Sequence, residues 1–80
     1  MKKINTTIEI DCEPFAPRPD VYFQHIWNEI LHRENNIPEP ISKFFGCWTW
    51  EITFTEEEQN AVGEYIKSLY NSGKIRYGSW

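Results

Sequence analysis

The sequence predicts a small α/β or α+β domain, in which a three-stranded sheet carries two helices on one face and the elements follow the order β-α-β-α-β. Two segments alternate apolar and polar residues with the period of a half-buried strand, and two others repeat apolar residues with the period of an amphipathic helix. The outward positions of both strands are polar, so both helices must cover the other face. A chain of 80 residues fits one domain, spanning residues 1–80.

The first strand is predicted over residues 3–12. Its alternation separates inward from outward side chains: Ile4, Thr6, Ile8 and Ile10 against Asn5, Thr7, Glu9 and Asp11. The three prolines within residues 13–19 remove backbone donors and restrict φ, which predicts a stiff loop after this strand.

The first helix is predicted over residues 20–33. Its apolar residues recur two to four positions apart: Val21, Phe23, Ile26, Trp27 and Ile30. Residues 34–36 end the helix, and Pro38 and Pro40 keep the chain extended until the central strand begins between Ile41 and Phe44.

The central strand runs directly into the second helix. The strand places one side-chain set on a single face: Trp48, Trp50, Ile52 and Phe54. Thr55 provides an N-cap hydroxyl, and Glu58 stands three residues later, which is the spacing of a capping box. The helix is predicted over residues 56–71 with Gly73 as its C′ residue, and a last short strand is predicted over residues 74–80.

The strand order depends on the direction of the strands. If all three are parallel, right-handed crossovers put both helices on one face only when the strands follow the order 1-2-3. A parallel sheet with one uncovered face is uncommon, so a mixed sheet with an antiparallel pair is the competing prediction.

The sequence contains no recognisable catalytic, phosphate-binding or metal-binding motif. The zinc-ligand residue types present are Cys12, His25, His32 and Cys47, but they lack the close spacing of Cys and His pairs in structural zinc sites. Either cysteine could in principle act as a nucleophile with His25 as its base, but no motif supports that arrangement. We therefore predict no catalytic residue, no metal and no cofactor.

Charge and hydropathy narrow the expected partners. A net charge of -4 repels phosphate backbones, which disfavours direct binding of nucleic acid. No apolar run approaches the roughly 20 residues of a membrane span, and no apolar segment follows the first residues as in a secretory signal. These features predict a cytoplasmic protein without membrane contact, located in the host-cell cytoplasm if it is encoded by a phage.

Six acidic residues are the predicted binding residues: Glu9, Asp11, Glu13, Glu51, Glu56 and Glu57. By alternation, the strand acids point away from the helices and towards an open sheet face. The acids of residues 56–58 also favour the positive end of the helix dipole, which explains them structurally. The aromatic ends at residues 44–45 and 77–80 are candidate interface anchors, because Trp and Tyr often dominate binding energy.

These patterns favour a small acidic, non-catalytic inhibitor that binds another protein and blocks a basic functional surface. In size and charge the chain is similar to small acidic phage-encoded inhibitors, including anti-CRISPR and other anti-defence proteins; an antitoxin or immunity protein would share these features. The alternative is a ligand-binding or catalytic homo-oligomer with its pocket at a subunit interface, because one protomer of this size has little room to enclose a ligand. The oligomeric state is left open.

Overall fold

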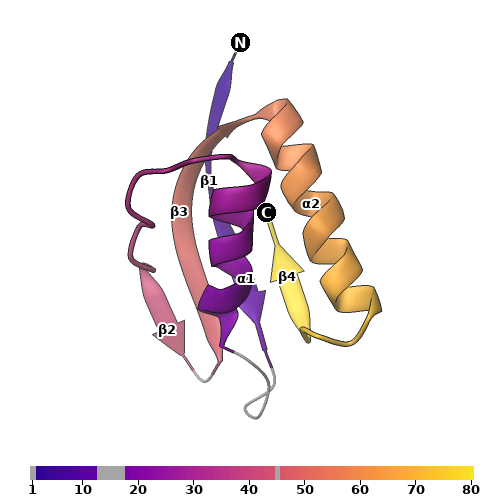
Figure 1. Ribbon diagram of the computed structural model, residues 1–80. Helices are drawn as coiled ribbons and strands as arrows, with labels where there is room; N and C mark the ends of the chain where they lie inside the picture. The colour runs from indigo at the N-terminus through magenta and orange to yellow at the C-terminus, as the bar shows by residue number, and fades with distance from the viewer. Residues whose placement is uncertain (1, 13–17, 45) are drawn as a thin grey trace.

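The computed structural model describes residues 2–12, 18–44 and 46–80. In chain order the elements are β1 (Lys3–Asp11), α1 (Pro19–His25), the π-helical turn η1 (Ile26–Ile30), β2 (Ser42–Phe44), β3 (Cys47–Thr55), α2 (Glu56–Asn71) and β4 (Tyr77–Ser79). Figure 1 shows α1 and α2 side by side on one face of the sheet. The fold of the described residues is therefore a two-layer α+β arrangement, with both helices on the same face as predicted.

The sheet is antiparallel throughout, with the order β2-β3-β1-β4 in the described part of the chain. The predicted three-stranded sheet is wrong, and so is the order 1-2-3 of the all-parallel alternative. The competing prediction is correct in expecting antiparallel pairing, but every pair is antiparallel and the sheet is not mixed. β1 pairs with β3 along its whole length, from Lys3 opposite Thr55 to Asp11 opposite Cys47. Because β3 and β4 both run antiparallel to β1, they are parallel to each other and lie on either side of it. The connection from β3 through α2 to β4 therefore crosses over β1, which lies between these two strands in the sheet.

The additional strand arises from a hairpin that the sequence pattern did not reveal. We predicted one continuous strand starting between Ile41 and Phe44, but β2 ends at Phe44 and turns back through Gly46 into β3. Gly46 has a φ of +84°, and a Cβ atom there would lie 2.6 Å from the carbonyl oxygen of Cys12. Three residues are too few to show alternation, and the turn lacks the Asn-Gly or Asp-Gly signature of short hairpins. Phe45 and residues 13–17 of the predicted stiff loop lie outside the described residues, whereas Pro19, predicted as the end of that loop, is the first residue of α1.

The first helix ends earlier than predicted and changes its geometry. The amide of Leu31 donates to the carbonyl of Ile26, five residues back, which widens the last turn into η1. His32 then adopts a φ of +52°, so the helix cannot continue to Arg33. The Arg33 side chain instead donates to the carbonyl of Thr53 at 2.7 Å. That bond ties the end of the helix to β3.

The second helix follows the prediction closely. The Thr55 hydroxyl accepts from the Glu58 amide at 3.2 Å, and the Glu58 carboxylate accepts from the Thr55 amide at 2.8 Å, which completes the capping box. Gly73 follows the C-cap with a φ of +79°, as expected of a C′ glycine. Neither this helix nor any other described helix is long and apolar enough to cross a membrane.

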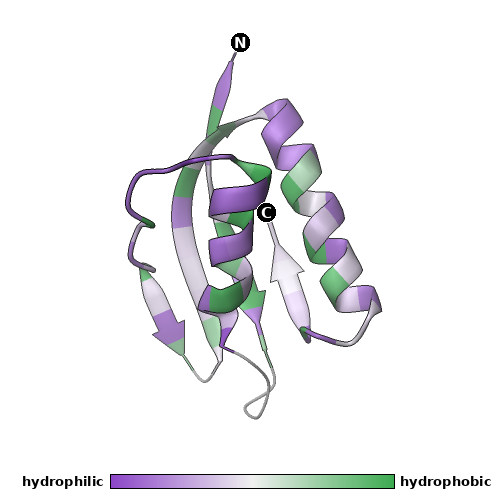
Figure 2. Ribbon diagram, viewed as in Figure 1, coloured by the Kyte–Doolittle hydropathy of each residue, from purple (hydrophilic) through white to green (hydrophobic). Residues whose placement is uncertain are grey.

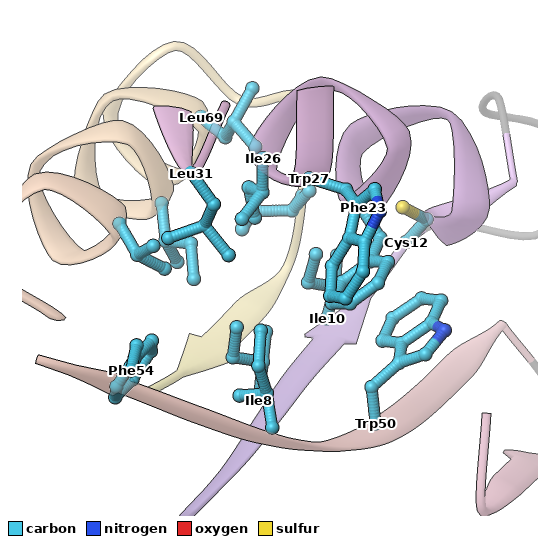
Figure 3. Packing of buried hydrophobic residues seen from close by; sticks show 14 residues of the cluster. Ile8, Ile10, Cys12, Phe23, Ile26, Trp27, Leu31, Trp50, Phe54 and Leu69 are labelled. Carbon is cyan, nitrogen blue, oxygen red and sulfur yellow. The ribbon is translucent and has the colours of Figure 1, made fainter. Parts of the chain in front are cut away.

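The core lies between the sheet and the helices, on the face that the strand alternation predicted. The ring of Phe23 from α1 stacks on Trp50 from β3 with a centroid distance of 4.2 Å and an interplanar angle of 4° (Figure 3). The side of α1 that faces away from the sheet is mostly hydrophilic, and the strands behind it carry hydrophobic segments (Figure 2). The buried hydrophobic residues are Ile8, Ile10, Cys12, Phe23, Ile26, Trp27, Leu31, Trp50, Ile52, Phe54, Val62, Ile66, Leu69 and Ile75. This layer leaves the opposite sheet face outside the core.

Candidate protein-binding face

The sheet surface opposite the helices is called the open face. Residues paired across adjacent strands point to the same side, so the strand registers define its members. They are Lys3, Asn5, Thr7, Glu9, Asp11, Ser42, Phe44, Cys47, Thr49, Glu51, Thr53, Thr55, Tyr77 and Ser79. Their inward neighbours on β1 and β3 include the buried Ile8, Ile10, Trp50 and Ile52. In the described part of the chain, the open face is covered by neither helix (Figure 1).

One row of side chains crosses all four strands of the open face. Phe44 is opposite Cys47, Cys47 is opposite Asp11, and Asp11 is opposite Tyr77. The two aromatic residues occupy the outer strands, about 14 Å apart at the usual strand spacing. Phe44 is 67% exposed and Tyr77 is 51% exposed. This row therefore presents two exposed rings with a thiol and a carboxylate between them.

Glu9 holds an oriented negative charge beside that row. Its carboxylate accepts a hydrogen bond from the Thr49 hydroxyl at 3.3 Å and is also hydrogen-bonded to the Cys47 thiol. Both donors are neutral, and Glu9 has no ion-pair partner among residues 2–12, 18–44 and 46–80. Its half-buried charge is therefore positioned by the sheet without being neutralised by it.

The other two acids of the open face differ from Glu9 and from each other. Asp11 accepts a hydrogen bond from the Arg76 guanidinium at 2.8 Å, so its charge is compensated within the chain. Glu51 is exposed, stands opposite Thr7, and has no ion-pair partner among the described residues. The negative potential of this face therefore comes mainly from Glu9 and Glu51.

The two cysteines lie on opposite faces of the sheet. Burial raises the pKa of the Cys12 thiol to about 11, and this side chain is part of the core. The pKa of the Cys47 thiol on the open face is raised by burial first, and then by the charges of Glu9 and Asp11 and the hydrogen bond to Glu9. Both thiols are therefore protonated at neutral pH, and Cys47 acts as a hydrogen-bond donor rather than as an activated nucleophile.

The structure also separates the four residues of zinc-ligand type, for which no metal site was predicted. His25 stacks on Tyr65 with a centroid distance of 4.6 Å, and His32 occupies the left-handed turn after η1. With Cys12 and Cys47 on opposite faces, these four side chains do not converge. Within the described ranges, no group of three or more His, Cys, Asp and Glu residues is placed to hold a metal ion.

The six predicted binding residues do not form one cluster. Glu9, Asp11 and Glu51 share the open face, whereas Glu56 and Glu57 lie in the first turn of α2 beyond the end of β3. Thr49, opposite Glu9, is six residues before Thr55 and Glu51 is four residues before it, so the two groups are about 13–20 Å apart along the strand. Glu13 lies outside the described residues.

Sequence reasoning gave no indication of how β4 pairs with β1. The aromatic ends of residues 44–45 and 77–80 were predicted as candidate anchors, but not the row that joins Phe44 and Tyr77 through Asp11. The ion pair between Asp11 and Arg76 was missed for the same reason. Only the register of β4 against β1 brings these residues together, and no local pattern encodes that register.

Comparisons with protein-family models, curated proteins and solved structures find no match for this chain. The geometry of the open face is therefore the basis for a functional assignment.

Proposed function

We propose that this protein is a non-catalytic inhibitor that docks its open face on a basic surface of another protein and blocks that surface. The observation that carries the proposal is the row from Phe44 to Tyr77, with the uncompensated carboxylate of Glu9 beside it. Aromatic residues, Tyr and Phe among them, are enriched in protein–protein interfaces, and Tyr is common among binding hot spots. An acidic phage-encoded inhibitor of the anti-CRISPR or anti-defence type is the class that this size and charge favour.

The chemistry of the partner follows from the charge of the face. A lysine or arginine of the partner would meet Glu9 where the Thr49 and Cys47 side chains already orient it, so little side-chain ordering is needed on binding. The same cation can contact the exposed ring of Phe44 or Tyr77 through a cation–π interaction. A partner with an acidic surface would be repelled, so the face discriminates by charge as well as by contact.

The dimensions of the open face limit how the partner can bind. β1 and β3 have nine residues each, and β2 and β4 have three each. The face is therefore about 30 Å long but four strands wide only at one end, and its area is roughly 400 Å². A stable interface buries about 800 Å² on each partner. The partner must therefore also contact residues around the edge of the open face.

Affinity capture from an extract of the cells that express the protein tests this proposal. The face variant carries Glu9→Lys and Glu51→Lys, and the control carries Glu34→Lys and Glu64→Lys, two exposed glutamates away from the open face. Both pairs change the net charge equally, so a general electrostatic effect would appear in both. A Glu56→Lys and Glu57→Lys pair shows whether the second acidic group contributes.

A protein retained by the parent and the control, but lost with the face variant, would support the proposal. With that partner purified, the face variant should bind at least about tenfold more weakly, associate more slowly and show less dependence on salt. If the face variant binds with the parent's affinity, the open face is not the interface. If every captured protein is lost equally with both variants, only net charge matters and the proposal fails.

A further inference from the structure

The two edges of the sheet differ in how they are protected against a further strand. In the described part of the chain, the edge strands are β2 and β4. β2 carries Lys43 and begins two residues after Pro40, and charged residues and prolines both hinder the addition of a strand. β4 consists of Tyr77, Gly78 and Ser79. Apart from its short length, β4 therefore lacks both protections.

A groove lies beside the outer edge of β4. α2 packs next to β4 (Figure 1), and the groove of about 270 Å³ lies between these two elements. Within the described ranges, its lining comes from α2, β4 and Trp80, and not from β1. The groove is therefore on the side of β4 that faces away from β1, where a fifth strand would lie. Tyr70 is 58% exposed and Tyr77 is 51% exposed, so the lining includes aromatic surface that a ligand can reach.

The backbone of β4 offers hydrogen bonds on the same side. Among residues 2–12, 18–44 and 46–80, β4 pairs with β1 alone. Alternate N–H and C=O groups of an edge strand point away from its partner strand, and an extended peptide can pair with them. Gly78 is opposite the buried Ile10, so this pair faces the helix side. A residue opposite Gly78 in a fifth strand would therefore direct its side chain into the groove.

One end of the groove carries an uncompensated positive charge. The Nζ atom of Lys67 lies 5.8 Å from the centroid of the Trp80 ring. Lys67 is exposed and forms no ion pair with any residue that the structure describes. Trp80 stands two residues after Gly78, and its ring lies against Gly63 of α2, so it points to the same helix side. Lys67 is therefore placed to face a side chain about 7 Å along a fifth strand from the residue opposite Gly78.

We propose that the outer edge of β4 binds an extended segment of another protein as a fifth strand, with an apolar side chain in the groove and an acidic side chain, two residues away, facing Lys67. Backbone hydrogen bonds hold the segment to β4, the groove selects the apolar residue, and Lys67 selects the acidic one. The groove is smaller than the roughly 300–1,000 Å³ of sites that enclose drug-sized ligands. That size suits one side chain of a peptide better than a complete small molecule.

The charge of the groove separates this occupant from two others. A second copy that paired through its own β4 would bring no acidic residue to Lys67, and its Gly78 has no side chain for the groove. A basic surface, which is the proposed partner of the open face, would be repelled by Lys67. The inference uses neither Glu9 nor Glu51, so it goes beyond the proposed function.

Titration by NMR with a panel of short peptides tests the proposal. Each peptide is blocked at both ends and carries Leu, Ile, Val or Phe two positions from Glu on a threonine background, in both orders, because a strand can add in either direction. The backbone amide of Gly78 reports on β4. At least one peptide should shift this resonance saturably at millimolar concentration. At low ionic strength, replacing its Glu by Lys should weaken binding about tenfold.

Methylation of the peptide backbone separates strand addition from simple contact with the groove. Along a strand, successive N–H groups point to opposite neighbours, so N-methyl groups on alternate residues block one edge and leave the other intact. Two versions of the binding peptide, methylated in the two alternate frames, should therefore differ. One should lose at least about tenfold in affinity, and the other should bind as the parent peptide does.

Two charge variants test the role of Lys67. Lys67→Glu should reverse the preference, so that the peptide with Lys binds more tightly than the peptide with Glu. Lys43→Glu is the matched control, because Lys43 also lies over a tryptophan ring, 4.6 Å from the centroid of Trp48, but belongs to β2 at the other edge of the sheet. Thermal midpoints of both variants confirm that each one folds before affinities are compared.

The proposal is overturned if no peptide of the panel shifts the Gly78 amide, if both methylated versions bind alike, or if Lys67→Glu and Lys43→Glu have the same preference. It is also overturned if the Gly78 amide shifts with protein concentration in the absence of peptide, since that indicates self-association through β4. A reversed preference in Lys67→Glu alone, with loss of binding in one methylation frame, supports it. None of these outcomes bears on the open face, because its test variants retain Lys67.

Discussion

Replacing Trp50 by alanine should remove a large part of the stability of this protein. Trp50 is 1% exposed and stacks almost parallel on Phe23, which joins β3 to α1. Truncation to alanine leaves a cavity that neighbouring residues fill only in part, because Phe23 is held by its own helix. The loss therefore includes both buried apolar surface and the aromatic contact.

The expected loss is about 4 kcal/mol. Truncation of a buried aromatic residue to alanine costs about 3–5 kcal/mol, and an aromatic pair contributes about 0.5–1.5 kcal/mol beyond the area that it buries. A domain of this size has about 5–15 kcal/mol of stability in total, so the variant should be close to unfolding at room temperature. In urea, with a slope of about 1–2 kcal/mol per molar, the midpoint should fall by about 2–4 M.

Trp48→Ala is the matched control for this prediction. Trp48 lies on the same strand and the same face, but it is only half-buried, at the wall of a cavity that α1 and residues 37–40 also line. Its ring is tilted 47° from that of Trp50. Its truncation should cost about 1–2 kcal/mol, less than the 3–5 kcal/mol expected when alternation alone is considered. Equal shifts of the urea midpoint in the two variants would refute the reasoning, as would a loss below 1 kcal/mol for Trp50→Ala.

Three further predictions concern the helix cap and the two thiols. Thr55→Ala should lower the free energy of unfolding by about 1 kcal/mol, measured by urea denaturation, whereas Thr55→Ser should retain the parent's midpoint because it keeps the capping hydroxyl. Cys47 should react with a thiol reagent at pH 8 more slowly than an unfolded control, and Glu9→Gln should accelerate the reaction, since the Glu9 charge helps to raise the pKa of this thiol. If Glu9→Gln leaves the reaction rate of Cys47 unchanged, the charge of Glu9 does not influence the pKa of this thiol. Between about pH 9 and pH 11 the free energy of unfolding should fall by about 2 kcal/mol more in the parent than in Cys12→Ala, because the unfolded chain releases the Cys12 proton at a lower pH than the folded chain. Parallel pH profiles of the two proteins would contradict that assignment.

The contacts within the open face change the stability that is expected for its charge variants. By alternation alone, Glu9, Asp11 and Glu51 should contribute little to folding. Asp11 is an exception, because reversing its charge breaks the ion pair with Arg76 and places two cations together. The pair is partly exposed, so its loss should cost less than about 1 kcal/mol. Tests of binding are therefore cleaner with Glu9 and Glu51.

Local patterns in the sequence determined which face of each long strand is buried and where α2 begins and ends. The alternation of β1 and β3 and the capping box at Thr55 depend on residues within a few positions of each other, so they can be read without a fold. The same alternation placed Glu9, Asp11 and Glu51 opposite the helices. These properties follow from side-chain periodicity and local hydrogen bonding.

Only the tertiary structure decided how the strands pair and what the sites contain. The insertion of β1 between β3 and β4 sets Tyr77 opposite Asp11, and the short hairpin through Gly46 brings Phe44 into the same row. The π-helical turn ends the first helix early, through a hydrogen bond that a 3.6-residue period does not represent. A cavity beside Trp48 is likewise lined by three separate parts of the chain: α1 with its N-cap, residues 37–43, and β3. Such contacts join residues far apart in sequence, and their free energy depends on the whole packed arrangement, so no local pattern reveals them.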